Sequence, residues 1–132
     1  MERPSHAGLR HLALNARDLE AMKRFYIDML GFVVEWEPDP DNVYLSSGID
    51  NLALHRAKDL PRGVSSLDHL GLIVRQADDV DRWGAFLESR GVIVEGKPRT
   101  HRDGARSIYL RDPDGNSVQI IYHPPISDTV KG

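Results

Sequence analysis

Residues 18–35, DLEAMKRFYIDMLGFVVE, are echoed sixty positions later by residues 78–95, DDVDRWGAFLESRGVIVE, with Gly31 matching Gly91. A short apolar run that holds one histidine precedes each copy: LRHLALN at residues 9–15 and LDHLGLIV at residues 67–74. Downstream, VYLSSGIDNLALH at residues 43–55 resembles IYLRDPDGNSVQII at residues 108–121. Self-similarity at a long, fixed period indicates a supersecondary unit that occurs more than once. The sequence therefore predicts two similar halves.

Each copy predicts a strand, a helix and then three further strands. The helical segments carry apolar residues at three- and four-residue spacing, which places them on one face. These residues are Leu19, Met22, Phe25, Tyr26 and Met29 in the first copy and Val80, Trp83, Phe86 and Leu87 in the second. The expected fold is α+β, with two βαβββ modules that form an open barrel-like mixed sheet and with helices on its outer face.

Turn and cap residues mark where these elements begin and end. Asp18 and either Asp78 or Asp79 suit the helix starts, and Gly31 and Gly91 suit left-handed helix ends. The run DPDG at residues 112–115 predicts a turn between two strands. The 132 residues suit a single domain. We expect module one at about residues 8–56, a linker at about 57–66, module two at about 67–124 and a loose tail at 125–132.

Composition is that of an ordinary globular protein and excludes several function classes. No segment approaches the ~20 apolar residues that a membrane span needs, so no membrane partner is expected. The net charge is -3 and the basic residues are scattered among acids, unlike the basic stripe of a nucleic-acid-binding protein. The chain has no cysteine, which excludes disulfides and thiol nucleophiles. Residues 1–8 are too polar for a signal peptide, so the expected location is cytoplasmic.

Strand alternation predicts which side chains face a shared concave surface, because successive side chains point to opposite faces. The leucines at residues 12 and 14 belong under the helix, which leaves His11 on the concave face. His69 has the same place in the second copy, and Gln119 faces the same way from the last strand. Burial under the helices is predicted for Leu12, Leu14, Phe25, Leu70, Leu72, Phe86, Val118 and Ile120.

The other histidines carry weaker signals. Ala53 and His55 face the pocket from the last strand of the first copy, so His55 is a third candidate. A lone histidine in an apolar strand is more often a hydrogen-bonded structural residue, and His55 has Asn51 or solvent as possible partners. Two histidines at equivalent places of a repeat favour a shared site instead. His6, His101 and His123 lie in polar or terminal contexts, and we interpret them as surface residues.

Four groups of residues together resemble the vicinal oxygen chelate superfamily, which includes glyoxalase I, extradiol dioxygenases, fosfomycin-resistance proteins, methylmalonyl-CoA epimerase and bleomycin-binding proteins. They are LRHL at residues 9–12 with DLE at 18–20, FY at 25–26 with LGF at 30–32, DHLGL at 68–72, and LRDPDGN at 110–116. The resemblance spans roughly residues 8–124. It implies paired βαβββ modules around a divalent metal that chelates neighbouring oxygens of a substrate, and assembly as a homodimer.

The resemblance implies metal ligands at His11, His69 and Gln119, because the family takes its ligands from the first and last strands of each module. The fourth such position is Ala53, which cannot ligate, and His55 is its nearest substitute. The family pattern usually has glutamate where this chain has Gln119, although some members of the family use glutamine. One pair of unit charges at about 4 Å and an effective dielectric of about 20 is worth roughly 4 kcal/mol, or about three decades of affinity. We therefore expect weak binding of Zn, Ni, Co, Mn or Fe(II).

Two function classes follow from the resemblance. The first is a divalent-metal-dependent enzyme of lyase, isomerase or dioxygenase type that acts on a small substrate with vicinal oxygens, with His55 and Tyr109 as catalytic residues. Ring cleavage ranks lower, because non-haem iron oxygenases use two histidines and one carboxylate. The second is a metal-free small-molecule binding or resistance protein of the bleomycin-binding type. The substrate pocket is predicted to contain Ala13, Trp36, Tyr44, Ala53 and Tyr109.

Two further sets of charged residues stay open as candidates. Glu35, Glu37 and Glu95 lie on or after the second strands and are possible bases. A cationic clamp for a phosphonate has candidates by position in Lys97, Arg99, Arg102 and Arg106.

Overall fold

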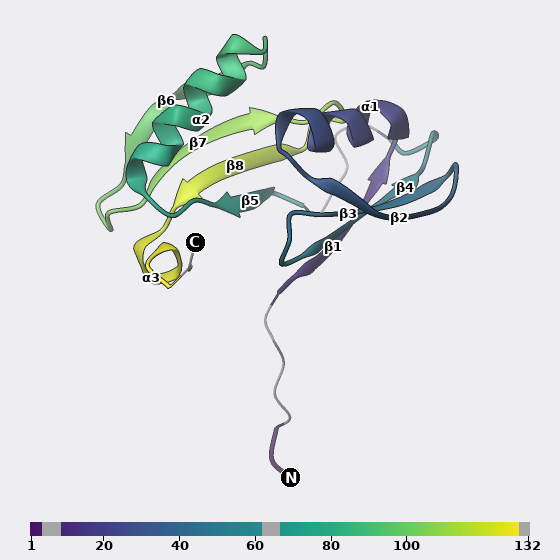
Figure 1. The fold of residues 1–132 in the computed structure, drawn as a ribbon, viewed down its shortest axis with the longest axis horizontal. Coiled ribbons are helices and arrows are strands. Elements are labelled where there is room, and N and C mark those ends of the chain that lie inside the picture. Colours follow the sequence, from purple (N-terminus) through teal and green to yellow (C-terminus); the bar gives the residue numbers. More distant parts are fainter. Residues whose placement is uncertain (4–8, 62–66, 130–132) are drawn as a thin grey trace. The chain divides into compact units, whose positions relative to one another are not determined.

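The chain folds into two compact units, which a computed structural model describes over residues 1–3, 9–61 and 67–129 (Figure 1). The units are Met1–Arg62, here called unit 1, and Gly63–Gly132, called unit 2. The second half of the predicted linker, residues 62–66, the end of the predicted tail, residues 130–132, and His6 lie outside the described residues.

Unit 1 contains one mixed four-stranded sheet and one helix whose second half is a π-helix. Its elements are β1 (His11–Ala16), α1 (Leu19–Arg24), η1 (Phe25–Met29), β2 (Val33–Asp39), β3 (Asn42–Ser46) and β4 (Asn51–Arg56). The strand order is β1-β4-β3-β2. β1 is parallel to β4, whereas β3 is antiparallel to both of its neighbours.

Unit 2 repeats this topology. Its elements are β5 (His69–Ile73), α2 (Ala77–Ser89), β6 (Val94–Thr100), β7 (Arg106–Arg111), β8 (Ser117–Tyr122) and α3 (Pro124–Ser127). The strand order is β5-β8-β7-β6, with β5 parallel to β8 and the other pairs antiparallel. The predicted α+β class and βαβββ order are therefore confirmed in both units. The eight described strands form two separate four-stranded sheets, neither of which is closed into a barrel.

The helix of unit 1 packs through the apolar stripe that its sequence predicts. Leu19, Met22 and Tyr26 are buried, while Phe25 and Met29 are half-buried. The helix starts at Asp18, as predicted, where the carboxylate accepts a hydrogen bond from Ala21 N at 3.1 Å. This bond satisfies one of the N–H groups that a first helical turn leaves without a partner.

The helix of unit 2, α2, packs against β6, β7 and β8 through a narrower stripe (Figure 1). Its buried residues are Val80, Gly84 and Leu87. Phe86, which was predicted to be buried, is 36% exposed, so that prediction is wrong. At ~100° per residue, a side chain next to Leu87 points well away from the stripe that these three residues define. The Phe86 ring instead packs edge-on against Trp83 and lies 4.9 Å from the guanidinium carbon of Arg90.

Both helices end at the predicted glycines, but the second helix does not begin at a predicted cap. Gly31 and Gly91 both have φ of 78°, a conformation that glycine adopts without the cost that other residues incur. The start of α2 corrects the sequence prediction, because its N-cap is Gln76. Asp79 reaches back from the first turn, and its Oδ2 accepts a hydrogen bond from Gln76 N at 3.1 Å.

Burial alternates along the first strand of each unit, as the sequence predicts. In β1 the even-numbered residues are buried or half-buried and the odd-numbered ones are exposed. β5 shows the same alternation. Of the residues predicted to lie under the helices, Leu14, Val118 and Ile120 are buried, and Leu12, Phe25, Leu70 and Leu72 are half-buried. In each unit the histidine of the first strand thus lies on the face opposite the packed leucines.

A short helix follows β8. Residues 124–127 form α3, which overlaps the start of the predicted tail at residues 125–132, and Ser127 is buried. Ser127 Oγ accepts a hydrogen bond from His123 N at 2.9 Å, which ties the short helix back to the end of β8. Among the described residues, no helix is both long enough and apolar enough to cross a membrane.

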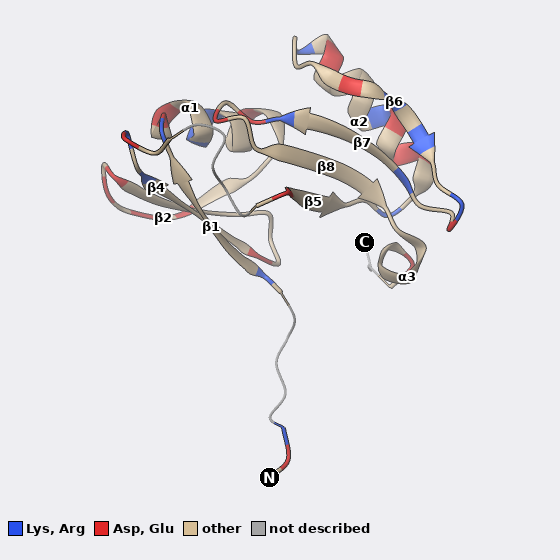
Figure 2. Ribbon diagram, turned by 180° about the vertical axis from the view of Figure 1, so that it is seen from behind, with Lys and Arg blue, Asp and Glu red and all other residues tan. Residues whose placement is uncertain are grey.

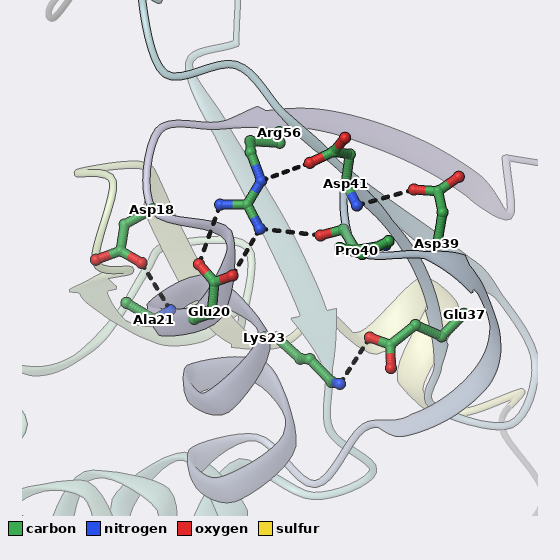
Figure 3. Close-up of polar contacts among 9 residues, drawn as sticks. All are labelled: Asp18, Glu20, Ala21, Lys23, Glu37, Asp39, Pro40, Asp41 and Arg56. Carbon is green, nitrogen blue, oxygen red and sulfur yellow. Dashed lines mark hydrogen bonds and ion pairs between the residues drawn. The ribbon is translucent and has the colours of Figure 1, made fainter.

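Arg56, at the end of β4, ties three elements of unit 1 together (Figure 3). Its guanidinium donates to both carboxylate oxygens of Glu20 in α1, at 2.6 and 3.1 Å, and to Asp41 Oδ1 between β2 and β3, at 2.8 Å. A fourth hydrogen bond reaches the carbonyl oxygen of Pro40 at 2.9 Å. The hydrogen bonds from Arg56 lower the pKa of Glu20 to about 2.

Candidate functional site

Strand register aligns the predicted site residues of unit 1 in rows across the sheet face opposite the helix. In the central row Ala13 pairs with Ala53, Ala53 with Tyr44, and Tyr44 with Trp36. His11 and Asn51 pair in the row on one side of it, and His55 pairs with Asn42 in the row on the other side. The residues of unit 1 that the sequence predicts for the site therefore share one face: His11, Ala13, Trp36, Tyr44, Ala53 and His55.

His11 is joined to a carboxylate through an asparagine. His11 Nδ1 lies 2.8 Å from Asn51 Oδ1, and Asn51 Nδ2 donates to Glu35 Oε1 at 3.2 Å. The three residues come from β1, β4 and β2. An irregularity between Val34 and Trp36 gives β2 one extra residue there, which is the geometry of a β-bulge. Adjacent residues of a regular strand point to opposite faces, but the bulge lets Glu35 and Trp36 both lie on the open face.

His55 has a second arrangement of the same kind. Its Nδ1 lies 2.6 Å from Asn42 Oδ1, and Asn42 Nδ2 donates to the two oxygens of Asp39 at 2.9 and 3.1 Å. Asp39 Oδ1 also accepts a hydrogen bond from Asp41 N at 2.8 Å (Figure 3). The expected partner Asn51 is not used, because the register places Asn42 directly opposite His55.

Aromatic rings extend the open face of unit 1. Trp36 stacks on Tyr44 with ring centroids 5.2 Å apart and an interplanar angle of 21°. Tyr44 meets His55 edge to face, with centroids 6.0 Å apart. Trp36 keeps 60% of its surface exposed. The stack offers a flat aromatic surface of the kind that binds planar ligands.

The open face of unit 2 is built around Gln119. Gly71, Gln119, Tyr109 and Glu95 pair in one row across β5, β8, β7 and β6. Gln119 is 8% exposed, and its side chain has no hydrogen bond among the described residues. A Cβ atom at Gly71 would lie 3.8 Å from Gln119 Oε1, so glycine leaves space beside the amide oxygen. β5 and β8 carry no charged residue (Figure 2).

His69 lies on the same face, one row away from Gln119. His69 Nδ1 is 2.6 Å from Asp68 Oδ1. The side chain of Asp68 is 93% exposed, so solvent weakens this contact. The His69 ring meets Tyr109 edge to face with centroids 5.8 Å apart. Unit 2 therefore brings together three predicted site residues, namely His69, Tyr109 and Gln119.

The predicted metal ligands belong to both units. His11 is part of unit 1, whereas His69 and Gln119 are part of unit 2. In the part of the chain that the structure describes, no three histidine, aspartate or glutamate side chains form a group that could hold a metal ion. The predicted set has only two such residues, because its third donor is an amide.

The three candidate bases have different partners. Glu35 faces Asn51, as described above. Glu37 turns toward α1, where Lys23 Nζ donates to its Oε2 at 2.6 Å (Figure 3). Glu95 accepts a hydrogen bond from Arg111 Nε at 2.7 Å. Of these three carboxylates, Glu35 alone is linked to a candidate histidine among the described residues, by hydrogen bonds through Asn51.

The predicted cationic clamp loses one of its members to a structural role. Arg106 donates to both oxygens of Asp81 in α2, at 2.7 and 2.9 Å. These hydrogen bonds lower the pKa of Asp81 and raise the pKa of Arg106. Arg106 thus ties β7 to the helix of unit 2.

Sequence reasoning missed Asn42 and Asp39, and it placed Asn51 beside His55 where the structure places it beside His11. Asparagine and aspartate near strand ends usually indicate turns, and residue spacing does not say which residues pair across strands. The two asparagines become recognisable only once the register sets Asn51 opposite His11 and Asn42 opposite His55.

Comparison with known proteins identifies relatives along almost the whole chain. Residues 8–120 match the Glyoxalase/Bleomycin resistance protein/Dioxygenase superfamily. Metallothiol transferase FosB of Bacillus licheniformis is 28% identical over 124 residues, which cover 91% of this chain and 78% of that protein. Uncharacterized protein YraH of Bacillus subtilis is 27% identical over 122 residues, covering 85% and 95% respectively.

Two solved structures agree with this result. The crystal structure of lactoylglutathione lyase from Agrobacterium tumefaciens superimposes with a TM-score of 0.77 and 26% identity, covering 92% of this chain and 98% of that one. The glyoxalase family protein from Enterococcus faecalis superimposes with a TM-score of 0.71 and 27% identity, covering 86% and 96%.

Proposed function

The chain belongs to the glyoxalase/bleomycin resistance protein/dioxygenase superfamily, and on that premise we propose that it is a divalent-metal-dependent enzyme acting on a small substrate with vicinal oxygens. The observation that carries the proposal is the state of Gln119. Its side chain is 8% exposed and has no hydrogen-bond partner among the described residues. Neither amide atom of Gln119 is sealed from solvent, so its oxygen can accept a bound ion or ligand in place of water.

The donors of the proposed site fit a divalent ion. His11, His69 and Gln119 would supply two imidazole nitrogens and one amide oxygen, which zinc and related ions accept. In both histidines Nδ1 is engaged by a neighbouring oxygen, which leaves Nε2 available. A bound ion would act as a Lewis acid that polarises an oxygen of the substrate.

We assign acid–base roles to His55 and Tyr109. His55 Nδ1 is held by Asn42, so its Nε2 is the nitrogen that can exchange a proton with a substrate. The Tyr109 ring contacts the His69 ring, and Tyr109 is the register partner of Gln119 on the neighbouring strand. Its phenol therefore lies on the same sheet face as both residues. Lyase and isomerase reactions fit these residues best. The relative named metallothiol transferase adds a transferase reaction as an alternative within the enzyme class.

A metal-free binding protein is the second candidate function, and the Trp36–Tyr44 stack favours it. The exposed, nearly parallel rings would bind a planar molecule without any metal. Ala13 and Ala53, beside Tyr44 in the same row, would leave room for such a ligand.

Calorimetric titration of chelator-stripped protein with Zn, Ni, Co, Mn and Fe(II) separates the two functions. The enzyme proposal predicts weak but measurable binding by the parent protein. His69→Ala should weaken that binding more than tenfold, because one of three donors is lost. Gln119→Glu should tighten it by up to about three decades, because a carboxylate supplies the missing charge.

Gln76→Glu is the matched control, since Gln76 is the only other glutamine of the chain and caps α2. It adds the same charge away from the site and should leave metal affinity unchanged. Binding by the Gln119→Glu variant alone would favour the metal-free function for the natural protein. Absence of binding by every variant would overturn the enzyme proposal.

Assembly as a homodimer is part of the proposal and rests on the family resemblance. Sedimentation of the intact chain at micromolar concentration should give twice the 14.9 kDa mass of one chain. A single 14.9 kDa species would contradict the dimer without affecting the metal proposal.

A further inference from the structure

The hydrogen-bond chains of unit 1 determine which nitrogen of each histidine carries the proton. The carboxylates set the direction of each chain of hydrogen bonds, because an ionised carboxylate can only accept them. Glu35 Oε1 therefore requires the NH2 group of Asn51 to face it, at 3.2 Å. The oxygen of the same amide must then face His11, and it too can only accept. At 2.8 Å from that oxygen, His11 Nδ1 must be the donor.

His55 is held by the same kind of chain, with shorter hydrogen bonds. Asp39 accepts from Asn42 Nδ2 through both of its oxygens, at 2.9 and 3.1 Å. The Asn42 amide is thereby fixed in one orientation, with Oδ1 2.6 Å from His55 Nδ1. Asp39 is itself anchored by Asp41 N, so its carboxylate cannot turn away freely. His55 Nδ1 must again donate.

We propose that Asn51 and Asn42 are positioning residues that hold His11 and His55 in the Nδ1–H tautomer, with Glu35 and Asp39 as their anchors. A neutral imidazole with its proton on Nδ1 has its lone pair on Nε2. Each ring then presents one defined nitrogen, Nε2, as a metal ligand or a base. The value of this arrangement to the reaction rests on the proposed function, but the tautomer itself does not.

Unit 2 supports the inference by contrast, because both asparagines have a serine at the equivalent register position. Ser117 pairs with His69 where Asn51 pairs with His11. Ser107 pairs with Ile121 where Asn42 pairs with His55. A serine hydroxyl both donates and accepts, so it cannot dictate the direction of a hydrogen bond as an anchored amide does. The bridges are therefore a property of unit 1.

The two bridges should differ in strength. The His55 bridge is partly buried and its asparagine is held by two oxygens. The His11 bridge is exposed and its outer bond is 3.2 Å long. Water competes more effectively for exposed hydrogen bonds, so the tautomer should be more nearly complete at His55 than at His11.

Nitrogen chemical shifts of the imidazole rings test the proposal directly. Long-range ¹H–¹⁵N spectra of metal-free, ¹⁵N-labelled protein at alkaline pH distinguish protonated from unprotonated ring nitrogens. His11 and His55, assigned with single His→Gln variants, should show a protonated Nδ1 and an unprotonated Nε2. Asn51→Leu should return only His11 to the mixed tautomers of free imidazole, and Asn42→Leu only His55. Each variant is thus the control for the other.

Conservative variants separate positioning from simple packing. Asn51→Asp combined with Glu35→Gln keeps an acceptor beside His11 and a donor beside the new carboxylate, so it should restore the tautomer. Glu37→Gln is the matched control for Glu35, because Glu37 lies on the same strand but binds Lys23. It should leave both rings unchanged. An unprotonated Nδ1 in the parent, or a tautomer that survives both leucine variants, would overturn the proposal.

Metal affinity gives the second readout. Residues that orient a metal-binding histidine typically contribute about 10- to 100-fold in affinity, so Asn51→Leu should weaken binding by roughly that factor. The outcomes distinguish the two proposals. If the tautomers are as stated and no metal binds, the bridges stand and the metal-dependent function fails. If metal binds and the tautomers are mixed, the function stands and the bridges fail.

Discussion

The two units share one backbone plan but fill equivalent positions with different chemistry. Tyr44 in β3 and Tyr109 in β7 occupy equivalent positions. Tyr44 pairs with Ala53, whereas Tyr109 pairs with Gln119, so Ala53 and Gln119 are equivalent residues of the two units. Trp36 of unit 1 corresponds in the same way to Glu95. The duplicated topology therefore fixes where side chains can meet, and the individual residues decide what they do.

The open faces of the two sheets carry different kinds of side chain. Unit 1 has two histidines anchored to carboxylates through asparagines, beside an aromatic stack. Among its predicted site residues, unit 2 has one histidine, His69, and a nearly buried amide, and the ion pair of Arg111 with Glu95 lies in the same sheet. Unit 1 thus supplies preoriented imidazoles and unit 2 an unpartnered oxygen.

The helices of the two units differ in their hydrogen-bonding pattern, which sequence periodicity did not predict. Asp18 and Gly31 enclose as many residues as Asp78 and Gly91. Even so, unit 1 widens into the π-helix η1, whereas α2 is α-helical over its 13 residues. Tyr26, in η1, is fully buried between Phe25 and Phe32, which its ring meets edge to face. A π-turn is rare and is often found at functional sites.

The largest effects are expected from matched core substitutions at Leu45 and Leu110. Both residues are fully buried, and they occupy equivalent places in β3 and β7. Leu45→Ala and Leu110→Ala should each lower the free energy of unfolding by about 2–5 kcal/mol, through lost burial and the cavity left behind. Urea unfolding measures both losses. Losses that differ by more than about twofold would show that the two cores are not packed equivalently.

The fold was predictable because its signals are local and repeated. The helix stripes, the glycines at the helix ends and the alternation of the first strands can each be recognised within a short segment. Phe86 was misassigned because periodicity alone does not say how wide the buried stripe of a helix is. The site was harder to predict, since Asn51, Asn42 and Glu35 contribute only through strand register and a bulge.

An intermediate effect is expected where the units differ in how an arginine ties the helix to the sheet. Arg56, in β4, donates hydrogen bonds to the two carboxylates of Glu20 and Asp41. Arg106, in β7, donates to Asp81 and Thr100. The pKa of Glu20 falls to about 2 through its bonds with Arg56. A carboxyl group whose pKa is lower in the folded state stabilises the fold above its unfolded pKa and loses that contribution as pH falls.

Thermal unfolding of the parent and of Glu20→Gln checks this expectation. The melting temperature of the parent should exceed that of the variant at pH 7, and the difference should persist down to about pH 4.5. It should then shrink as the pH approaches about 2, the folded pKa of Glu20. Asp81→Asn should show a similar decline in unit 2. A difference that stays constant down to pH 2 would mean that Glu20 acts through packing and not through its charge.

The smallest expected effect is a gain of stability when Gly84, one of the three buried residues of α2, is replaced by alanine. A Cβ atom at this position would lie 3.8 Å from Ile108 Cδ1, which is an ordinary contact and not a clash. Glycine inside a helix costs about 1 kcal/mol relative to alanine, so Gly84→Ala should stabilise the protein by about 0.5–1 kcal/mol. Gly91→Ala is the matched control and should destabilise instead, because φ there is 78°. Urea unfolding in which Gly84→Ala lowers stability would mean that α2 needs the closer approach to β7 that glycine permits.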